Sequence, residues 1–151
     1  MTDTAQAQQF QEQLMQFIRG LGLHRPDATP CDFPVSLAEA CAMVALNKHE
    51  PMSQRDLGDA LNLEKSTVSR LVIDMVQRGW VERARDAHDG RIQLLRRTPQ
   101  GMAVAEQIVQ ARNMRFGELL MRVDPLRRQQ IVDAMTLLAE VVTNDVDATH
   151  R

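Results

Sequence analysis

The 151-residue sequence predicts a mainly α-helical fold that carries one small β-hairpin. Apolar residues recur at helical spacing along most of the chain, which is typical of helices that pack through one face. Near the middle, the segments WVERA and RIQLLRR alternate or run apolar like strands and flank the polar stretch RDAHDG. A chain of this length with 44% apolar residues buries enough surface to fold without disulfide or metal staples.

The N-terminal part of the chain predicts two helices and a rigid connector. The first helix carries apolar residues at helical spacing from Phe10 onward and ends at Gly20 and Gly22. The connector, LHRPDATPCDFPV, holds three prolines and therefore cannot be helical. Ser36 then caps a second helix, which runs over LAEACAMVALNKH with Glu39 as its capping-box partner.

Two short helices joined by a tight turn follow Pro51, and together they make a helix-turn-helix. Ser53 caps the first, SQRDLGDALNL, with Asp56 in the position of a capping-box partner. Only NLE separates it from the second pattern, in which apolar residues recur at i, i+3, i+4, i+7 and i+8. The positions expected to be buried in the two helices are Leu57, Ala60, Leu61, Val68, Leu71, Val72, Met75 and Val76.

The second of these helices, EKSTVSRLVIDMVQRGW, begins with short hydroxyl side chains that are mediocre helix formers. In a helix that enters the major groove end-on, such hydroxyls can donate to and accept from base edges, while Lys and Arg reach guanine or phosphate. The alternative is that the hydroxyls satisfy first-turn amides and the cations are solvated. The candidate DNA contacts in the two helices are Ser53, Gln54, Lys65, Ser66, Thr67, Ser69 and Arg70.

The predicted hairpin follows this helix directly, after a left-handed stop at Gly79. Its loop region carries Arg83, Arg85 and Arg91, and basic residues on a thin projection can enter a minor groove, where negative potential is concentrated. Hairpin tips are polar in any case, so the hairpin alone is weak support for DNA binding. Arg85 and Arg91 are the candidate contacts from this wing.

Two longer helices complete the chain. Thr98 and Pro99 are a cap and a first helical residue for a helix through GMAVAEQIVQARNMRFGELLMRV, and Asp124 with Pro125 repeats this start signal for the last helix. The first and last helices keep apolar stripes that one short domain cannot cover. Read from the residues alone, these stripes fit either a dimer or an intramolecular bundle.

The order of a helix, the segment from Ser53 to Gly101 and two long helices resembles the MarR family of winged helix-turn-helix transcription regulators. The most specific elements are EKSTVSRLVIDMVQRGWVER, the wing motif DAHDGR, and RTPQG at the start of the long helix. Arg91 matches the wing-tip arginine of the family, with Asp89 placed to orient it, whereas Gly90 stands where many members have arginine.

The resemblance implies a homodimer that binds double-stranded DNA at a palindromic operator. It further implies repression that is released by a small lipophilic or phenolic effector. The whole chain, residues 1–151, is then one MarR-like protein. Residues 35–98 form the winged helix-turn-helix region, and residues 1–34 and 99–147 form the dimerisation helices and connector. Winged helices also serve as protein-interaction modules, which is the alternative from another functional class.

The distribution of charge supports the central region as the DNA-binding part. The net charge is −2, but residues 53–97 carry 9 Lys and Arg against 7 Asp and Glu, an excess of +2. Residues 1–52 carry 3 against 6 and residues 98–151 carry 6 against 7, so the basic excess lies in the middle. Scarce aromatics, four Phe and one Trp, argue against a stacking platform for single-stranded nucleic acid.

Catalytic, metal and redox roles receive little support from the sequence. No phosphate-cradling glycine loop or nucleophile elbow is present, so the sequence predicts neither an enzyme nor a cofactor. The histidines His24, His49, His88 and His150 lack metal-ligand spacing, and the neighbourhood of Cys31, Asp32, His24 and His49 is a weak metal candidate.

The cysteine and targeting signals lead to two further expectations. Cys41 is expected in the core and Cys31 in the connector, and a cysteine-based redox regulator remains an alternative. No apolar run of 18 residues and no signal peptide are recognisable, which predicts a cytoplasmic protein without membrane contact.

Overall fold

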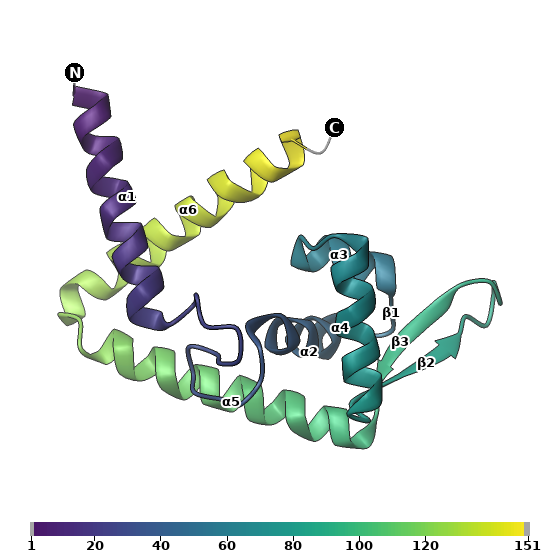
Figure 1. Cartoon of the computed structure of the whole chain (residues 1–151). Coiled ribbons are helices and arrows are strands. Elements are labelled where there is room, and N and C mark those ends of the chain that lie inside the picture. Colours follow the sequence, from purple (N-terminus) through teal and green to yellow (C-terminus); the bar gives the residue numbers. More distant parts are fainter. Residues whose placement is uncertain (1, 150–151) are drawn as a thin grey trace. The chain divides into compact units, whose positions relative to one another are not determined.

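The computed structural model describes residues 2–149 (Figure 1) and confirms a mainly helical fold with a small antiparallel sheet. The chain divides into two compact units, one up to Asn113 and one from Met114 onward. The elements are α1 (Thr2–Leu21), α2 (Leu37–His49), β1 (Met52–Ser53), α3 (Gln54–Leu61), α4 (Lys65–Gln77), β2 (Val81–Arg85), β3 (Gln93–Arg97), α5 (Pro99–Met121), the 3-10 turn η1 (Pro125–Arg127) and α6 (Arg128–Thr149). His150 lies outside the described residues.

Capping boxes begin α2 and α3, as the sequence predicts. The Ser36 hydroxyl accepts from the Glu39 backbone N–H at 3.2 Å, and the Glu39 carboxylate accepts from the Ser36 N–H at 2.8 Å. Ser53 and Asp56 form the same reciprocal pair at the start of α3. Each box satisfies backbone donors that the first helical turn leaves unpaired, and this fixes both helix starts.

The hairpin of β2 and β3 is confirmed, and a third strand that the sequence did not reveal joins it. The sheet order is β1-β3-β2, with Val81 paired to Arg97 and Arg85 paired to Gln93. The two residues of β1 pair with Leu94 and Leu95. A strand of two residues has no readable alternation, which is why the pattern could not predict it. It ties the start of α3 to the base of the wing.

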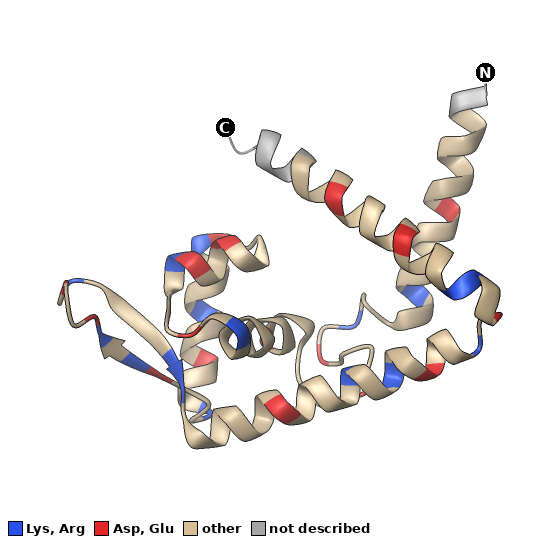
Figure 2. Cartoon of the chain, turned by 180° about the vertical axis from the view of Figure 1, so that it is seen from behind, with Lys and Arg blue, Asp and Glu red and all other residues tan. Residues whose placement is uncertain are grey.

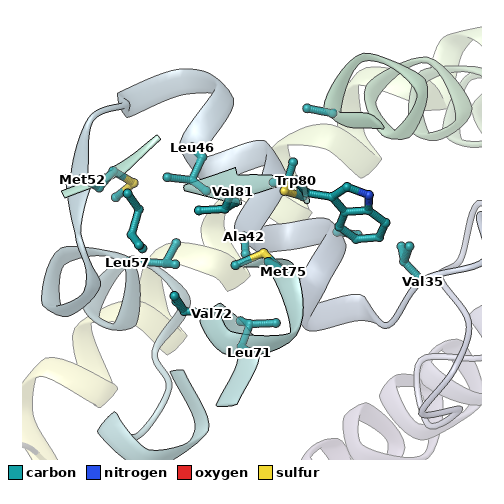
Figure 3. Close-up of a cluster of buried hydrophobic side chains, with 14 of the residues drawn as sticks. Val35, Ala42, Leu46, Met52, Leu57, Leu71, Val72, Met75, Trp80 and Val81 are labelled. Carbon is teal, nitrogen blue, oxygen red and sulfur yellow. The ribbon is translucent and has the colours of Figure 1, made fainter. Parts of the chain in front are cut away.

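One cluster of buried apolar side chains joins α2, α3, α4, the sheet and the first half of α5 (Figure 3). In Figure 3 the labelled side chains of these elements point toward one another. Burial of one such side chain contributes about 1.5–3 kcal/mol. The cluster therefore fixes the inner face of α4. Its members are Val35, Ala40, Ala42, Met43, Leu46, Met52, Leu57, Val68, Leu71, Val72, Met75, Trp80, Val81, Leu95, Ala105 and Ile108.

Three local expectations were wrong. Gly20 lies within α1, and the helix ends only before Gly22, which has a positive φ of 69°. Ala60 is exposed because α3 meets α4 through Leu57 and Gly58 instead. Val76 is 38% exposed, at the edge of the buried stripe. The predicted start of the last helix is confirmed, because Asp124 caps it by accepting from the Leu126 N–H, and its first turn is the 3-10 turn η1.

The start of α5 is locked to the base of the wing. The Thr98 hydroxyl donates to the Gly79 carbonyl at 2.5 Å and accepts from the Gly101 N–H at 3.0 Å. A Cβ on Gly101 would lie 1.8 Å from the Trp80 carbonyl oxygen. Glycine is therefore required at this position by a close approach of two backbones.

Apolar side chains remain exposed on α1 in the first unit and, separately, on α6 in the second. Phe10 is 50% exposed and Phe17 is 47% exposed on α1, while Leu137 and Val142 are each 61% exposed on α6. Within the described residues, no helix is long and apolar enough to cross a membrane. Monomeric globular proteins rarely expose apolar stripes of this kind, so each of the two helices carries a candidate interaction surface.

Candidate nucleic-acid interface

The outward face of α4 gathers the central group of predicted contacts. Lys65, Ser66, Thr67 and Arg70 are exposed, and Ser69 is half-buried. The N-cap residue Glu64 makes no side-chain cap hydrogen bond. Among the described residues, the hydroxyls of Ser66, Thr67 and Ser69 also form no hydrogen bond, so first-turn amides do not use them. Their donors and acceptors remain available to a ligand.

The two predicted contacts from α3 have different surroundings. The Ser53 hydroxyl already donates to the Asp56 carboxylate at 2.7 Å and accepts from its backbone N–H. Gln54 lines a hollow of about 400 Å³ between α3 and the start of α4, together with Arg55 and Lys65. The structure thus brings Gln54 and Lys65 together, while Ser53 serves chiefly as a cap.

The wing tip is a hydrogen-bonded turn. One oxygen of Asp86 accepts from the backbone N–H groups of His88 at 2.6 Å and Asp89 at 3.0 Å. Both hydrogen bonds lower the pKa of the Asp86 carboxyl, and the bond from Asp89 has the larger effect. The Asp89 carboxylate accepts from the backbone N–H of Arg91 at 3.0 Å, so it fixes the main chain of this residue.

The arginines of the wing make its surface basic. Arg83, Arg85 and Arg91 are exposed, and within residues 2–149 none of their guanidinium groups forms an ion pair. Figure 2 shows Lys and Arg positions along the hairpin and on α3 and α4, interspersed with acidic residues. The basic excess read from the sequence therefore lies on the elements expected to meet DNA.

A buried carboxylate anchors the far end of α4. Glu39 is 6% exposed, and its second oxygen lies 3.4 Å from the Arg78 Nε. The Arg78 guanidinium also lies over the Trp80 ring, 4.8 Å from its centroid. The capping residue of α2 thus also holds the C-terminus of α4. Sequence reasoning missed this role, because nothing in the spacing links positions 39 and 78.

A second ion pair fixes the base of the wing. The Glu50 carboxylate accepts from the Arg97 Nε at 2.9 Å, from the Arg97 Nη2 at 3.0 Å and from its backbone N–H at 3.0 Å. Asn47 accepts from the remaining Arg97 nitrogen. The Arg97 side-chain hydrogen bonds lower the pKa of the Glu50 carboxyl, against a smaller raising effect of burial. This pair joins the end of α2 to β3.

A groove of about 670 Å³ lies on a different surface, along α2, the end of α3 and Arg112 of α5. The apolar residues that line it include Leu37, Val44 and Leu61. Cys41 lines this groove half-buried, so its expected place in the core was wrong. Burial raises the pKa of the Cys41 thiol, and the charge of Arg112 offsets this only in part.

Among the described residues, the structure gathers no set of metal ligands around Cys31, where the sequence offers a weak metal candidate. The Cys31 sulfur lies 3.1 Å from the hydroxyl of the buried Thr29. Within the described part of the chain, no group of three or more His, Cys, Asp or Glu side chains could hold a metal ion.

A sequence model of the MarR family matches residues 33–92, which span α2, the helix-turn-helix and most of the wing. Over these residues the chain is similar to members of the MarR family. It is a transcriptional regulator of the winged-helix, DNA-binding type and not an enzyme. The matched segment contains the outward face of α4 and both anchoring carboxylates, Glu39 and Glu50.

Individual relatives are similar to the chain beyond the matched segment. The uncharacterized HTH-type transcriptional regulator YdgJ of Bacillus subtilis (strain 168) is 26% identical over 115 residues, covering 70% of each protein. The PcaV transcriptional regulator from Streptomyces coelicolor, solved with its natural ligand, has a TM-score of 0.66 at 21% identity, covering 88% of this chain and 91% of that one. BpsR of Bordetella bronchiseptica has a TM-score of 0.67 at 20% identity, covering 85% and 91%. The two solved structures show that the fold is shared.

Proposed function

We propose that this MarR-family regulator binds a palindromic operator as a homodimer and represses transcription until a small effector releases it. The outward face of α4 is the main support for direct DNA reading. It combines hydroxyls that form no hydrogen bond within residues 2–149 with the exposed cations Lys65 and Arg70, on a helix whose inner face is fixed in the core. Short side chains allow close approach to base edges, and cations reach guanine acceptors or phosphates.

The contacts are proposed to divide by role. Ser66, Thr67, Ser69 and Arg70 lie near base edges in the major groove, with Lys65 and Gln54 on the neighbouring phosphates. The wing residues Arg85 and Arg91 lie at the minor groove, where they respond to width and potential more than to base identity. Ser53 contributes through its cap, which positions Gln54.

The exposed stripes of α1 and α6 support dimerisation. Side chains such as Phe10 on α1 and Leu137 on α6 would be costly to leave in water, and a second copy of the chain provides matching surface. We therefore assign residues 1–34 and 99–147 to dimerisation and residues 35–98 to DNA binding. A twofold dimer presents two copies of α4, so its operator has twofold symmetry.

The groove along α2 supports release by an effector. Its lining, which combines apolar residues with Arg112, Lys48 and His49, suits a small lipophilic acid or phenol. The DNA binding of BpsR is described as regulated by 6-hydroxynicotinic acid. This is a property of that protein, and it is the kind of regulation that we propose for this chain. An aromatic carboxylate that releases DNA from the wild type and not from Arg112→Leu would support this site.

The alternatives are less well supported by the structure. A thiol whose pKa is raised is a poor nucleophile at neutral pH, which disfavours a redox switch at Cys41. Replacing Cys31 and Cys41 by Ser is expected to leave DNA binding and its response to peroxide unchanged. A winged helix used only for protein interaction would show no steep salt dependence on DNA.

Paired salt titrations of Arg70→Ala and Arg91→Ala test the proposed division of contacts. On its operator, Arg70→Ala is expected to lose about 1–3 kcal/mol per half-site and to relax preference at particular base pairs. Arg91→Ala is expected to weaken binding to operator and scrambled duplexes alike and to lower the salt slope by about one unit per protomer. If either folded, dimeric variant keeps wild-type affinity and slope, its assignment is wrong.

A further inference from the structure

The outermost position of α4 is occupied by an apolar residue. The buried stripe of this helix consists of Val68, Leu71, Val72 and Met75. Each residue turns an α-helix by about 100°, so Ile73 lies about 160° from both Leu71 and Met75. It is 44% exposed. An amphipathic helix normally places polar residues at this position.

Ile73 shares its face with the candidate base contacts. Ser66 precedes it by seven residues and Arg70 by three, so all three side chains lie along one line of the helix surface. Gln77, four residues further on, continues the line and is exposed. The outward face of α4 is therefore a continuous strip over the whole helix and not only over its first two turns.

The chemistry of the major groove offers an apolar group that suits this residue. Each base pair shows donors and acceptors there, and only thymine adds a methyl group at C5. Single exposed apolar residues are common on protein surfaces. This one, however, stands between Arg70 and Gln77 on the strip that the proposed function places against DNA.

We propose that Ile73 packs on the C5 methyl of a thymine in each half-site, with α4 lying lengthwise along the groove. This inference rests on the proposed DNA-binding function. Seven residues of helix span about 10.5 Å, so in an end-on approach Ile73 would stand further back than the groove depth of about 8.5 Å. Lengthwise docking brings Ser66, Arg70 and Ile73 to the bases together. It replaces the end-on placement inferred from the sequence.

The test replaces operator thymines by uracil, which removes only the C5 methyl. Affinities of the wild type and of Ile73→Ala are measured for each substituted duplex. At one or more thymines in each half-site, uracil is expected to weaken wild-type binding about fourfold, which corresponds to about 0.8 kcal/mol for one buried methyl. The same substitution is expected to change the affinity of Ile73→Ala by less than twofold.

Ile92→Ala is the matched control. Ile92 is 43% exposed on the wing, and the minor groove carries no methyl group, so this variant should keep the full uracil effect. Ile73→Thr, which keeps the β-branched shape, provides a second variant, and circular dichroism and light scattering confirm fold and dimer. Equal uracil effects in the wild type and both Ile73 variants, or no uracil effect at any thymine, overturn the proposal. If the proposed DNA-binding function itself is wrong, the wild type will prefer none of the duplexes. This outcome differs from a failure of the Ile73 contact alone.

Discussion

At the scale of single residues, the structure separates arginines that look alike in the sequence. Arg78 and Arg97 are engaged by Glu39 and Glu50, whereas the guanidinium groups of Arg70 and Arg91 form no ion pair within residues 2–149. An engaged arginine gives up an internal partner if it is to contact phosphate. We therefore expect the engaged pairs to contribute to stability, and we propose that Arg70 and Arg91 contribute to DNA binding.

Arg78→Ala tests this separation. The variant leaves the Glu39 carboxylate, which is 8% exposed as a side chain, without its cation. We expect a loss of about 1–2 kcal/mol in the free energy of unfolding, below the figure for fully buried pairs because Arg78 is 48% exposed. Urea denaturation measures this loss. The salt slope of DNA binding should stay at the wild-type value, and a drop equal to that of Arg91→Ala would instead make Arg78 a phosphate contact.

Glu50 predicts an acid-sensitive contribution to stability. Its pKa in the folded protein is lowered from an ordinary value of 4.5, first of all by the Arg97 side-chain hydrogen bond. Because the folded state holds the charged form, this stability is fully present above the unfolded pKa and is lost as pH falls through the folded one. Between pH 7 and pH 3, Glu50→Gln should flatten the fall in Tm. The exposed Glu106→Gln should reproduce the wild-type curve, and identical curves for all three proteins would contradict the role of Glu50.

At the scale of elements, Gly101 explains why the start of α5 needs a small residue. A Cβ at this position meets a carbonyl of the backbone and not the end of a flexible side chain. Gly101→Ala is therefore expected to cost about 3 kcal/mol of stability by forcing α5 away from Trp80. Gly90→Ala is the control, since its Cβ meets nothing within 4 Å and should change stability by less than about 0.5 kcal/mol. Equal stabilities of the two variants would show that this contact relaxes freely.

The elements themselves were largely predictable because their signals are local. Capping boxes at Ser36 and Ser53, the stop at Gly79 and the start at Thr98 each lie within a few residues of the boundary that they set. The contacts that orient the elements were not predictable, because they join distant positions. Glu50 lies 47 residues from Arg97, and β1 is recognised only through its pairing with β3. Likewise, which face of α4 is free follows from packing.

At the scale of the whole molecule, dimerisation is expected to depend on α1. Removing residues 1–22 deletes the exposed stripe that includes Phe10 and Phe17. The truncated protein should expose its partner surface and aggregate or lose operator binding, while the full chain should scatter light as about twice its 17.1 kDa mass. A full chain that stays monomeric at micromolar concentration would contradict the dimer.

Genomic footprinting of the purified full-length protein tests the central claim most directly, because it reports sequence preference and symmetry together. We predict protected sites that are imperfect palindromes, with half-site centres about 34 Å or 10 base pairs apart, so that two copies of α4 enter successive major grooves. Protection should disappear with Arg70→Ala at the protein concentration that saturates the wild type. Sites without twofold symmetry, or no protected site at all, would contradict a dimeric regulator that reads DNA through α4.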